Sequence, residues 1–573
     1  MTKFFTDVQQ AQPNLMKIVG LEKLQDESDT NIKFQIYSFN VNRMVDFSIK
    51  RTELSAEMLK KKISANDGVC PKDMNKLFLA VEEYVNSMLI QGDSSTWSVA
   101  HYKIGFRIRN GELVFLADSI YTKNGVIQSR YYGRIDLQPK GDFEEIRSMY
   151  ATLIESKSVA LPLSVLAAAS TVLSFSNHAW DTHIYNFIVH LLGSSSTGKS
   201  TILKLVASFS GNPDAVNGFF LSYLSTSNAI IESLCDSYGH PFVIDEFSTA
   251  KKKSNWTEEV YTIANGMEKA RCAAGGRMLQ ESTGFQGIYV SSGEISLSSK
   301  CGNNDGIMAR LFEITTDYDY SDNPDNKFTT SSSESDYIKS VVTNNYGILT
   351  PLIAQALLRK SDRYNYLRQG WLNRTKQRFR TDALDLNIAD RIMEYLAVIM
   401  TACEVMQDIL ELKFDLDRIF DYYYYHFLEK YSGDCNMDVR VYDVIKGFIG
   451  INKDRLYDSM NIFGVPRLND DYIGYFVNLS HYENKNRHRG ADGKYYDYLY
   501  MFPIDIIEDY LKGRGFEDPK TAINSLRKKK LIKYSRSGNN PKFDLPIDGV
   551  NVPMYAFWLE STEMDSMGMR GIF

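Results

Sequence analysis

The sequence predicts a multidomain α/β protein, and three observations support that prediction. The chain has 573 residues, more than one hydrophobic core usually serves, so several domains of about 100–200 residues each are expected. Near the middle, an apolar strand pattern runs directly into a glycine-rich loop and a helix, as in parallel α/β sheets. Near the end, two helical segments separated by a turn precede a hairpin pattern. We therefore expect a central α/β domain, an N-terminal α+β domain and a C-terminal winged helix.

The N-terminal domain is expected over residues 1–140. Apolar residues recur at helical spacing over 72–88, which predicts a helix. The alternating segments 102–109 and 113–116 flank Asn110-Gly111, a dipeptide that favours tight hairpin turns. Helix and hairpin together indicate an α+β domain.

The central domain is expected over residues 141–412 and ends in a strongly apolar helix over 387–412, interpreted as a helical lid. The strand at 185–192 leads into Gly193-Ser-Ser-Ser-Thr-Gly-Lys199-Ser200, which satisfies the full phosphate-loop pattern. Glycines let the backbone wrap phosphates, amides at the following helix N-terminus donate to them, and the lysine reaches the outer phosphates. We expect a nucleoside triphosphate to be bound by Gly193, Ser194, Ser195, Ser196, Thr197, Gly198, Lys199, Ser200, Thr201 and Asp245.

An acidic pair supplies the second half of such a site. The apolar run Pro241-Phe-Val-Ile ends in Asp245-Glu246, at the carboxyl end of a predicted strand. Ser200 and Asp245 are the expected Mg²⁺ residues, and Glu246 is the candidate catalytic base that orients the attacking water. A protein that only binds nucleotide does not need Glu246, so the pair favours hydrolysis.

Two further residues follow predicted strands of the same domain. Ser292 lies at the end of the strand 287–291, where a sensor of the γ-phosphate would stand beside the acidic pair; the alternative is a plain strand-end turn. Arg310 precedes the strand 311–314, where oligomeric ATPases place an arginine finger. An ordinary surface cation is the alternative for Arg310.

These motifs together carry a family resemblance. The phosphate loop, Val243-Ile-Asp-Glu-Phe247 and Ser291-Ser-Gly-Glu-Ile-Ser-Leu297 resemble one group of AAA+ ATPases, the MCM-like self-loading replicative helicases of staphylococcal pathogenicity islands and chromosome cassettes, with phage relatives. The resemblance covers about residues 140–410. It implies a hexameric ring of identical subunits that hydrolyses ATP, translocates on single-stranded DNA and unwinds duplex at a replication origin.

The resemblance also assigns individual residues. Arg310 corresponds to the arginine finger and Arg391, at the start of the lid helix, to the second sensor. Lys269, Arg271 and Arg277 flank Gly275-Gly276 in a predicted hairpin that would grip DNA in the pore, because basic side chains neutralise phosphates. A surface hairpin without that role is the alternative.

The C-terminal region is expected over 413–573 and to end in a winged helix over about 500–573. Helices are predicted at 504–511 and 520–530, with Asp518 as the cap and Pro519 at the first helical position of the second. The basic residues Arg527, Lys528, Lys529 and Lys530 would end the second helix. They favour contact with DNA phosphates, although winged helices also bind proteins.

The bulk composition limits the location and the partners. The net charge is −6, so attraction to DNA must come from local basic clusters. The six cysteines show no metal-ligand spacing, and the N-terminus lacks the apolar core of a signal peptide, which favours a cytoplasmic protein with no membrane span. The apolar stretch 159–175 is interpreted as a buried helix, since a span needs about 20 apolar residues.

Two alternatives to a helicase remain open at this stage. One is an ATP-switched origin-binding initiator that does not unwind DNA. The other is a protein-remodelling AAA+ ATPase, whose pore loop normally carries an exposed aromatic-hydrophobic pair. The predicted hairpin tip, Ala273-Ala-Gly-Gly-Arg277, has no aromatic residue. A protein-remodelling ATPase would also leave the basic residues of the tail without a role.

Overall fold

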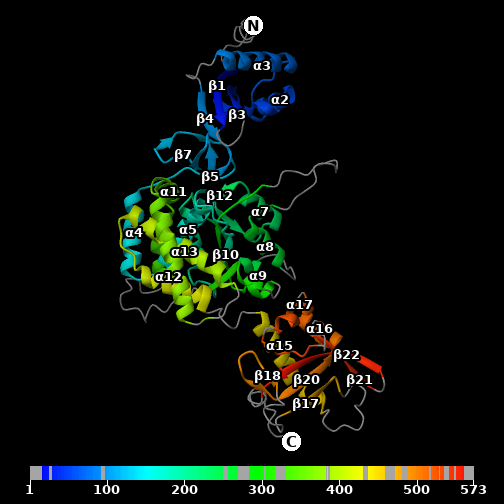
Figure 1. Ribbon diagram of the computed structural model, residues 1–573. Helices are drawn as coiled ribbons and strands as arrows, with labels where there is room; N and C mark the ends of the chain where they lie inside the picture. The colour runs from blue at the N-terminus through cyan, green and yellow to red at the C-terminus, as the bar shows by residue number, and fades with distance from the viewer. Residues whose placement is uncertain are drawn as a thin grey trace.

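The protein is a mixed α/β molecule with several sheets (Figure 1). The computed structural model describes all residues except 1–15, 25–28, 92–96, 250–255, 269–282, 302–304, 316–330, 383, 385–387, 430–436, 459–471, 480–487, 515, 517, 528, 535–540, 548–549 and 561–573. Figure 1 shows the N-terminal part in blue at the top, a large central body in the middle and the C-terminal part in orange and red below.

The N-terminal sheet has the strand order β3-β2-β1-β4-β9 and is covered by two helices. Its alternating buried residues, such as Phe34 stacked on Phe47, form a core of their own against those helices. The elements are β1 (Met16–Leu24), β2 (Thr30–Ser38), β3 (Arg43–Lys50), α2 (Ala56–Ala65), α3 (Met74–Gln91), β4 (Trp97–His101) and β9 (Arg130–Tyr131). The helix predicted over 72–88 is confirmed as α3.

A second sheet, with the order β12-β5-β6-β7-β8, joins the N-terminal part to the central body. The predicted hairpin is confirmed, with Asn110 and Gly111 both at positive φ (49° and 80°) between its strands. The strands are β5 (Ile104–Arg109), β6 (Glu112–Leu116), β7 (Ile120–Tyr121), β8 (Val126–Ile127) and β12 (Ser237–Tyr238). Gly105 (φ +89°) allows the close approach of β12, because a Cβ there would lie 2.0 Å from the carbonyl oxygen of Tyr238.

This second sheet shares its hydrophobic core with the central body. Phe106 and Phe115 belong to the same buried cluster as the central strands. His240, fully buried two residues before β13, bonds to the Leu116 carbonyl (3.2 Å) and to the Ser210 hydroxyl (2.9 Å). The boundary expected near residue 140 is therefore crossed by both strand pairing and core packing.

The central sheet is parallel throughout and has the order β11-β13-β14-β10-β15. Its strands are β10 (Phe187–Leu192), β11 (Phe220–Ser222), β13 (Phe242–Asp245), β14 (Ile288–Gly293) and β15 (Leu311–Thr315). Because the strands are parallel, their carboxyl ends meet at one edge of the sheet. The strand that follows β10 in the chain lies on one side of it and β15 lies on the other, so the strand order reverses at β10. The four strands predicted from sequence at 185–192, 241–245, 287–291 and 311–314 all lie in this sheet.

Helices pack on both sides of the central sheet. In Figure 1, α5 and α13 lie to the left of β10, and α8 and α9 lie to its right. The helices of this body are α4 (Phe143–Glu155), α5 (Ala160–Ala179), α6 (Lys199–Ser208), α7 (Ser227–Leu234), α8 (Thr257–Asn265), α9 (Asp305–Met308), α10 (Ser331–Val342), α11 (Leu349–Arg359), α12 (Ser361–Thr381), α13 (Ala389–Leu410) and α14 (Leu416–Tyr424). The predicted apolar helix over 387–412 is α13.

One helix within the described residues, α5, is long and apolar enough to cross a membrane by length and composition. Its most apolar window is 94% buried inside the protein, and α5 packs against α6, α11 and α13. The interpretation of 159–175 as a buried helix is confirmed.

In the C-terminal part, the described residues form a five-stranded sheet, β16-β17-β20-β22-β21, and three helices. Its elements, together with a two-stranded ribbon of β18 and β19, are α15 (Met437–Ile451), β16 (Leu456–Asp458), β17 (Gly474–Asn478), β18 (His488–Arg489), β19 (Tyr495–Tyr496), β20 (Tyr498–Pro503), α16 (Ile504–Gly513), α17 (Pro519–Ser525), β21 (Lys542–Ile547) and β22 (Val550–Leu559). The prediction of a helix over 520–530 is wrong at its C-terminal end. Helix α17 ends at Ser525, because the chain turns to bury Leu526, Leu531 and Ile532.

Candidate nucleotide site

The phosphate loop connects β10 directly to α6. Strand β10 is buried along almost its whole length, and Gly198, at φ +81°, is the N-cap of α6. Lys199 is only 9% exposed, and its ammonium donates to the carbonyl oxygens of Gly193 (2.8 Å) and Ser194 (2.5 Å). The loop is therefore wound around the lysine head group, with the backbone amides of the first α6 turn at its mouth.

The remaining loop residues differ in exposure. Ser194, Ser195, Ser196 and Ser200 are exposed, Gly193, Thr197 and Gly198 are half-buried, and Thr201 is buried. Ser196 adopts a left-handed φ of 66°. Ser195 donates to the Glu294 carboxylate, which fixes one side of the loop to the end of β14. The exposed Ser200 hydroxyl, at the second position of α6, is open to a ligand.

The acidic pair lies at the same edge of the sheet. Asp245 ends β13 half-buried, and the exposed Glu246 follows at φ 64°. The Glu246 amide donates to Asp245 Oδ1 (3.0 Å) and to Ser292 Oγ (3.3 Å), and the Ser292 hydroxyl donates to the same Asp245 oxygen. Ser292 is 2% exposed. The structure thus brings Ser292 into contact with the acidic pair, because β13 and β14 are neighbours in register.

A buried histidine that the sequence analysis missed supports this edge. His190 in β10 bonds to Ser291 Oγ (2.9 Å) and to the Ile295 carbonyl (3.1 Å), and Tyr223 bonds to the same serine (2.9 Å). Burial lowers the pKa of His190, so the imidazole is neutral and joins two strands by hydrogen bonds. A single polar residue within an apolar strand was the available signal.

Arg310 and Arg391 lie at the opposite edge of the sheet. Leu311 pairs in register with Ile188, so Arg310 stands beside the start of β10, whereas the phosphate loop follows its end. The Arg391 guanidinium lies 5.0 Å from the Tyr185 ring centroid, and that of Arg310 lies 5.6 Å from it. The structure brings the two arginines to one aromatic ring, and not to their own chain's phosphate loop.

The predicted DNA-gripping residues Lys269, Arg271 and Arg277 lie outside the described residues. The segments that flank them are held firmly. Met267 and Gly284 form an antiparallel bridge, and the Glu268 amide donates to the Thr283 carbonyl (3.1 Å). The second flank is bonded to β12, since the Gln286 amide donates to the Ser237 carbonyl (2.9 Å).

The basic residues predicted in the tail lie in different surroundings. Arg527, Lys529 and Lys530 follow α17 in a turn, and Lys528 lies outside the described residues. Arg527 and Lys530 are exposed, and Arg527 stacks on Tyr534 at 5.0 Å. Lys529 forms an ion pair with Asp438 of α15 (3.2 Å).

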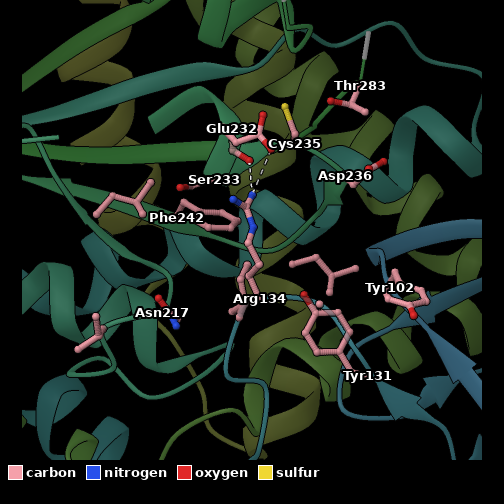
Figure 2. A pocket seen from close by; sticks show the side chains of 16 residues that line it. Tyr102, Tyr131, Arg134, Asn217, Glu232, Ser233, Cys235, Asp236, Phe242 and Thr283 are labelled. Atoms are coloured by element: carbon pink, nitrogen blue, oxygen red, sulfur yellow. Dashed lines mark hydrogen bonds and ion pairs between the residues drawn. The ribbon is translucent and has the colours of Figure 1, made fainter. Parts of the chain in front are cut away.

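A separate cavity of about 300 Å³ lies where the N-terminal part meets the central sheet (Figure 2). Figure 2 shows Arg134 pointing at Glu232, whose carboxylate is 3.6 Å from its guanidinium. Asp236, on the same lining, pairs with Lys103 and Arg107, each at 3.5 Å. These charged groups compensate one another, so the cavity is a polar junction between two parts of the chain.

Part of the chain matches a protein-family model, and nearly the whole chain resembles a solved structure. Residues 25–283 match a family described as a domain of unknown function, DUF927. No curated protein matches the chain. A solved structure titled "SCCmec type IV Cch - active helicase" superposes with a TM-score of 0.72, covering 97% of this chain and 95% of that one at 20% sequence identity. The chain therefore shares the fold of that protein over nearly its whole length.

Proposed function

We propose that this chain is an ATP-dependent DNA helicase of a mobile genetic element, acting in the cytoplasm as a ring of identical subunits. The observation that carries the proposal is the meeting of Lys199, Asp245, Glu246 and Ser292 at one edge of a parallel sheet. The similarity in fold to a protein titled an active helicase supports the same function. On this basis the central body is an AAA+ ATPase domain, with α13 as its lid and a winged helix in the tail.

Hydrolysis of ATP needs a held triphosphate, charge stabilisation and a positioned water. The phosphate loop and Lys199 would hold the phosphates. The hard oxygen donors of Ser200 and Asp245 suit Mg²⁺, which when bound would neutralise phosphate charge. Glu246, exposed beside the Asp245 and Ser292 pair, would accept the proton of the attacking water. Ser292 would orient Asp245 and sense the γ-phosphate.

Assembly into a ring supplies the residues that the site lacks. Arg310 and Arg391 stand at the edge of the sheet remote from their own phosphate loop. In a head-to-tail ring, that edge of one subunit faces the nucleotide of the next. Both arginines would then act on the neighbour's triphosphate, which is the geometry expected of a hexamer with ATP between subunits.

Contact with DNA is assigned to two basic elements. The residues that flank 269–282 are hydrogen-bonded to each other and to the residue before β12, and Lys269, Arg271 and Arg277 would bind single-stranded DNA. In the tail, the exposed Arg527 and Lys530 would bind duplex phosphates, for example at a replication origin. Lys528 and Lys529 belong to the same proposed surface, with Lys529 also engaged by Asp438.

The proposal is tested by ATP turnover and by unwinding of forked DNA with 3′ or 5′ tails. Lys199→Ala should abolish both activities, because the ammonium at the centre of the loop is lost. Lys204→Ala is the matched control: it removes a lysine from the same helix, paired with Asp214 and away from the loop. Normal ATP turnover by Lys199→Ala refutes the proposal. Turnover without unwinding on either tail favours an ATP-switched initiator or a protein-remodelling ATPase.

A further inference from the structure

Tyr185 lies beside two arginines that come from distant parts of the chain. It lies two residues before β10 and remains 45% exposed. Arg310 reaches it from the turn before β15 and Arg391 from the first turn of α13, at 5.6 Å and 5.0 Å from the ring centroid. Arg310 also lies 4.7 Å from the ring of Tyr261 in α8. Both guanidinium groups thus lie against the Tyr185 ring, and Arg310 has a second aromatic neighbour.

The two positive charges have no acidic partner among the residues that the structure describes. Arg310 makes one hydrogen bond, to the Gly306 carbonyl (2.9 Å), and its Nε is buried without a partner. Burial and the neighbouring Arg391 lower the pKa of Arg310, yet a guanidinium remains charged at any physiological pH. Two like charges held together in this way need compensation, and the negative face of an aromatic ring supplies part of it.

We propose that Tyr185 is a positioning residue that holds Arg310 and Arg391 side by side as a single two-armed receptor for the triphosphate of a neighbouring subunit. This inference rests on the proposed function. The ring keeps the two cations in one place despite their repulsion, and the incoming phosphates complete their hydrogen bonding. Without the ring face, each arginine is free to move to solvent, and neither is ready when the neighbour's nucleotide arrives.

The chemistry of the ring predicts which substitutions matter. Attraction to a cation comes from the aromatic face and does not need the phenolic hydroxyl. Tyr185→Leu keeps apolar bulk but removes the aromatic face, whereas Tyr185→Phe keeps the face and removes only the hydroxyl. Tyr366→Ala is the control for loss of a surface tyrosine, since Tyr366 is 80% exposed on α12.

The experiment compares steady-state ATP turnover of the full-length variants, with thermal melting to verify folding. Tyr185→Leu and Tyr185→Ala should lower kcat about tenfold, Tyr185→Phe should recover most of that loss, and Tyr366→Ala should match the parent. Adding Tyr185→Leu to Arg310→Ala should cost little more than Arg310→Ala alone, because residues that act through one another are not additive.

The outcomes separate the inference from the function on which it rests. If Lys199→Ala keeps its ATP turnover, the proposed function itself fails. If Lys199→Ala and Arg310→Ala are both inactive but Tyr185→Leu turns over ATP normally, the positioning role is overturned. Equal losses in Tyr185→Phe and Tyr185→Leu, or full additivity with Arg310→Ala, overturn it as well.

Discussion

Arg310 offers the sharpest test of the proposed ring, in which each subunit completes the site of its neighbour. Arg310 stands beside Phe187, at the start of β10, while the phosphate loop begins at Gly193. Six strand residues span roughly 20 Å. The bond lengths of an arginine side chain limit its reach to about 7 Å. The residue therefore cannot touch the phosphates of its own chain. Arg310→Ala should lower kcat by about a thousandfold or more, as loss of an arginine finger does.

The assay mixes two variants that are each expected to be inactive. Arg310→Ala retains an intact phosphate loop, and Lys199→Ala retains an intact arginine. In rings of random composition from an equal mixture, about a quarter of the head-to-tail interfaces combine a good loop with a good arginine. ATP turnover should therefore reappear on mixing, scale with the product of the two fractions, and vanish if the double variant Lys199→Ala/Arg310→Ala replaces either partner.

A clear result would refute this reasoning. If both variants assemble with each other, as light scattering or crosslinking can verify, and no ratio restores turnover, then Arg310 does not complete the neighbour's site. Substantial turnover by Arg310→Ala alone would also exclude the role, because the remote arginine would then be dispensable.

Three other predictions follow from the structure. Glu246→Gln should bind ATP with near-normal affinity but hydrolyse it at least about a hundredfold more slowly, since the base is lost; nucleotide-binding titration beside turnover checks this, and fast hydrolysis would contradict it. Burial lowers the pKa of His240 to about 4 from its ordinary value of 6.5. Below pH 6.5 the unfolded chain therefore binds a proton at His240 that the folded chain does not bind. Stability present above pH 6.5 is lost as the pH falls toward 4, by roughly 2 kcal/mol at pH 5, and His240→Gln should show a smaller loss in urea unfolding. Removing residues 519–573 should weaken binding to duplex DNA without making that binding more dependent on salt. An unchanged DNA footprint would argue against a DNA-reading tail.

The central sheet was the part of the fold most open to sequence analysis. The strands ending at Leu192 and Asp245 are apolar runs followed by chemically distinctive residues, so strand pattern and motif support each other. The pairing of Ser292 with Asp245 was anticipated only as proximity. Its hydrogen bond depends on the register of two strands far apart in sequence, and no local pattern encodes that register.

Other features could not be derived from local patterns. The strand Ser237–Tyr238 is too short to give a periodic signal, and its partner β5 lies more than a hundred residues earlier. The early end of α17 follows from burial of Leu526, Leu531 and Ile532, which overrides the helix propensity of the lysines that follow. The meeting of Arg310 and Arg391 at Tyr185 is likewise a tertiary contact between three separate elements.

The shared strand β12 has a practical consequence for dissecting the protein. A fragment beginning at residue 141 would retain Ser237 and Tyr238 but lose their partner strand β5. It would also lose Phe106 and Phe115 from a core that it needs, leaving an open strand edge and an uncovered apolar surface, both of which promote aggregation. A fragment of the central body that is to stay soluble should begin upstream of β5, so the shortest autonomous form of this part of the chain includes the second sheet.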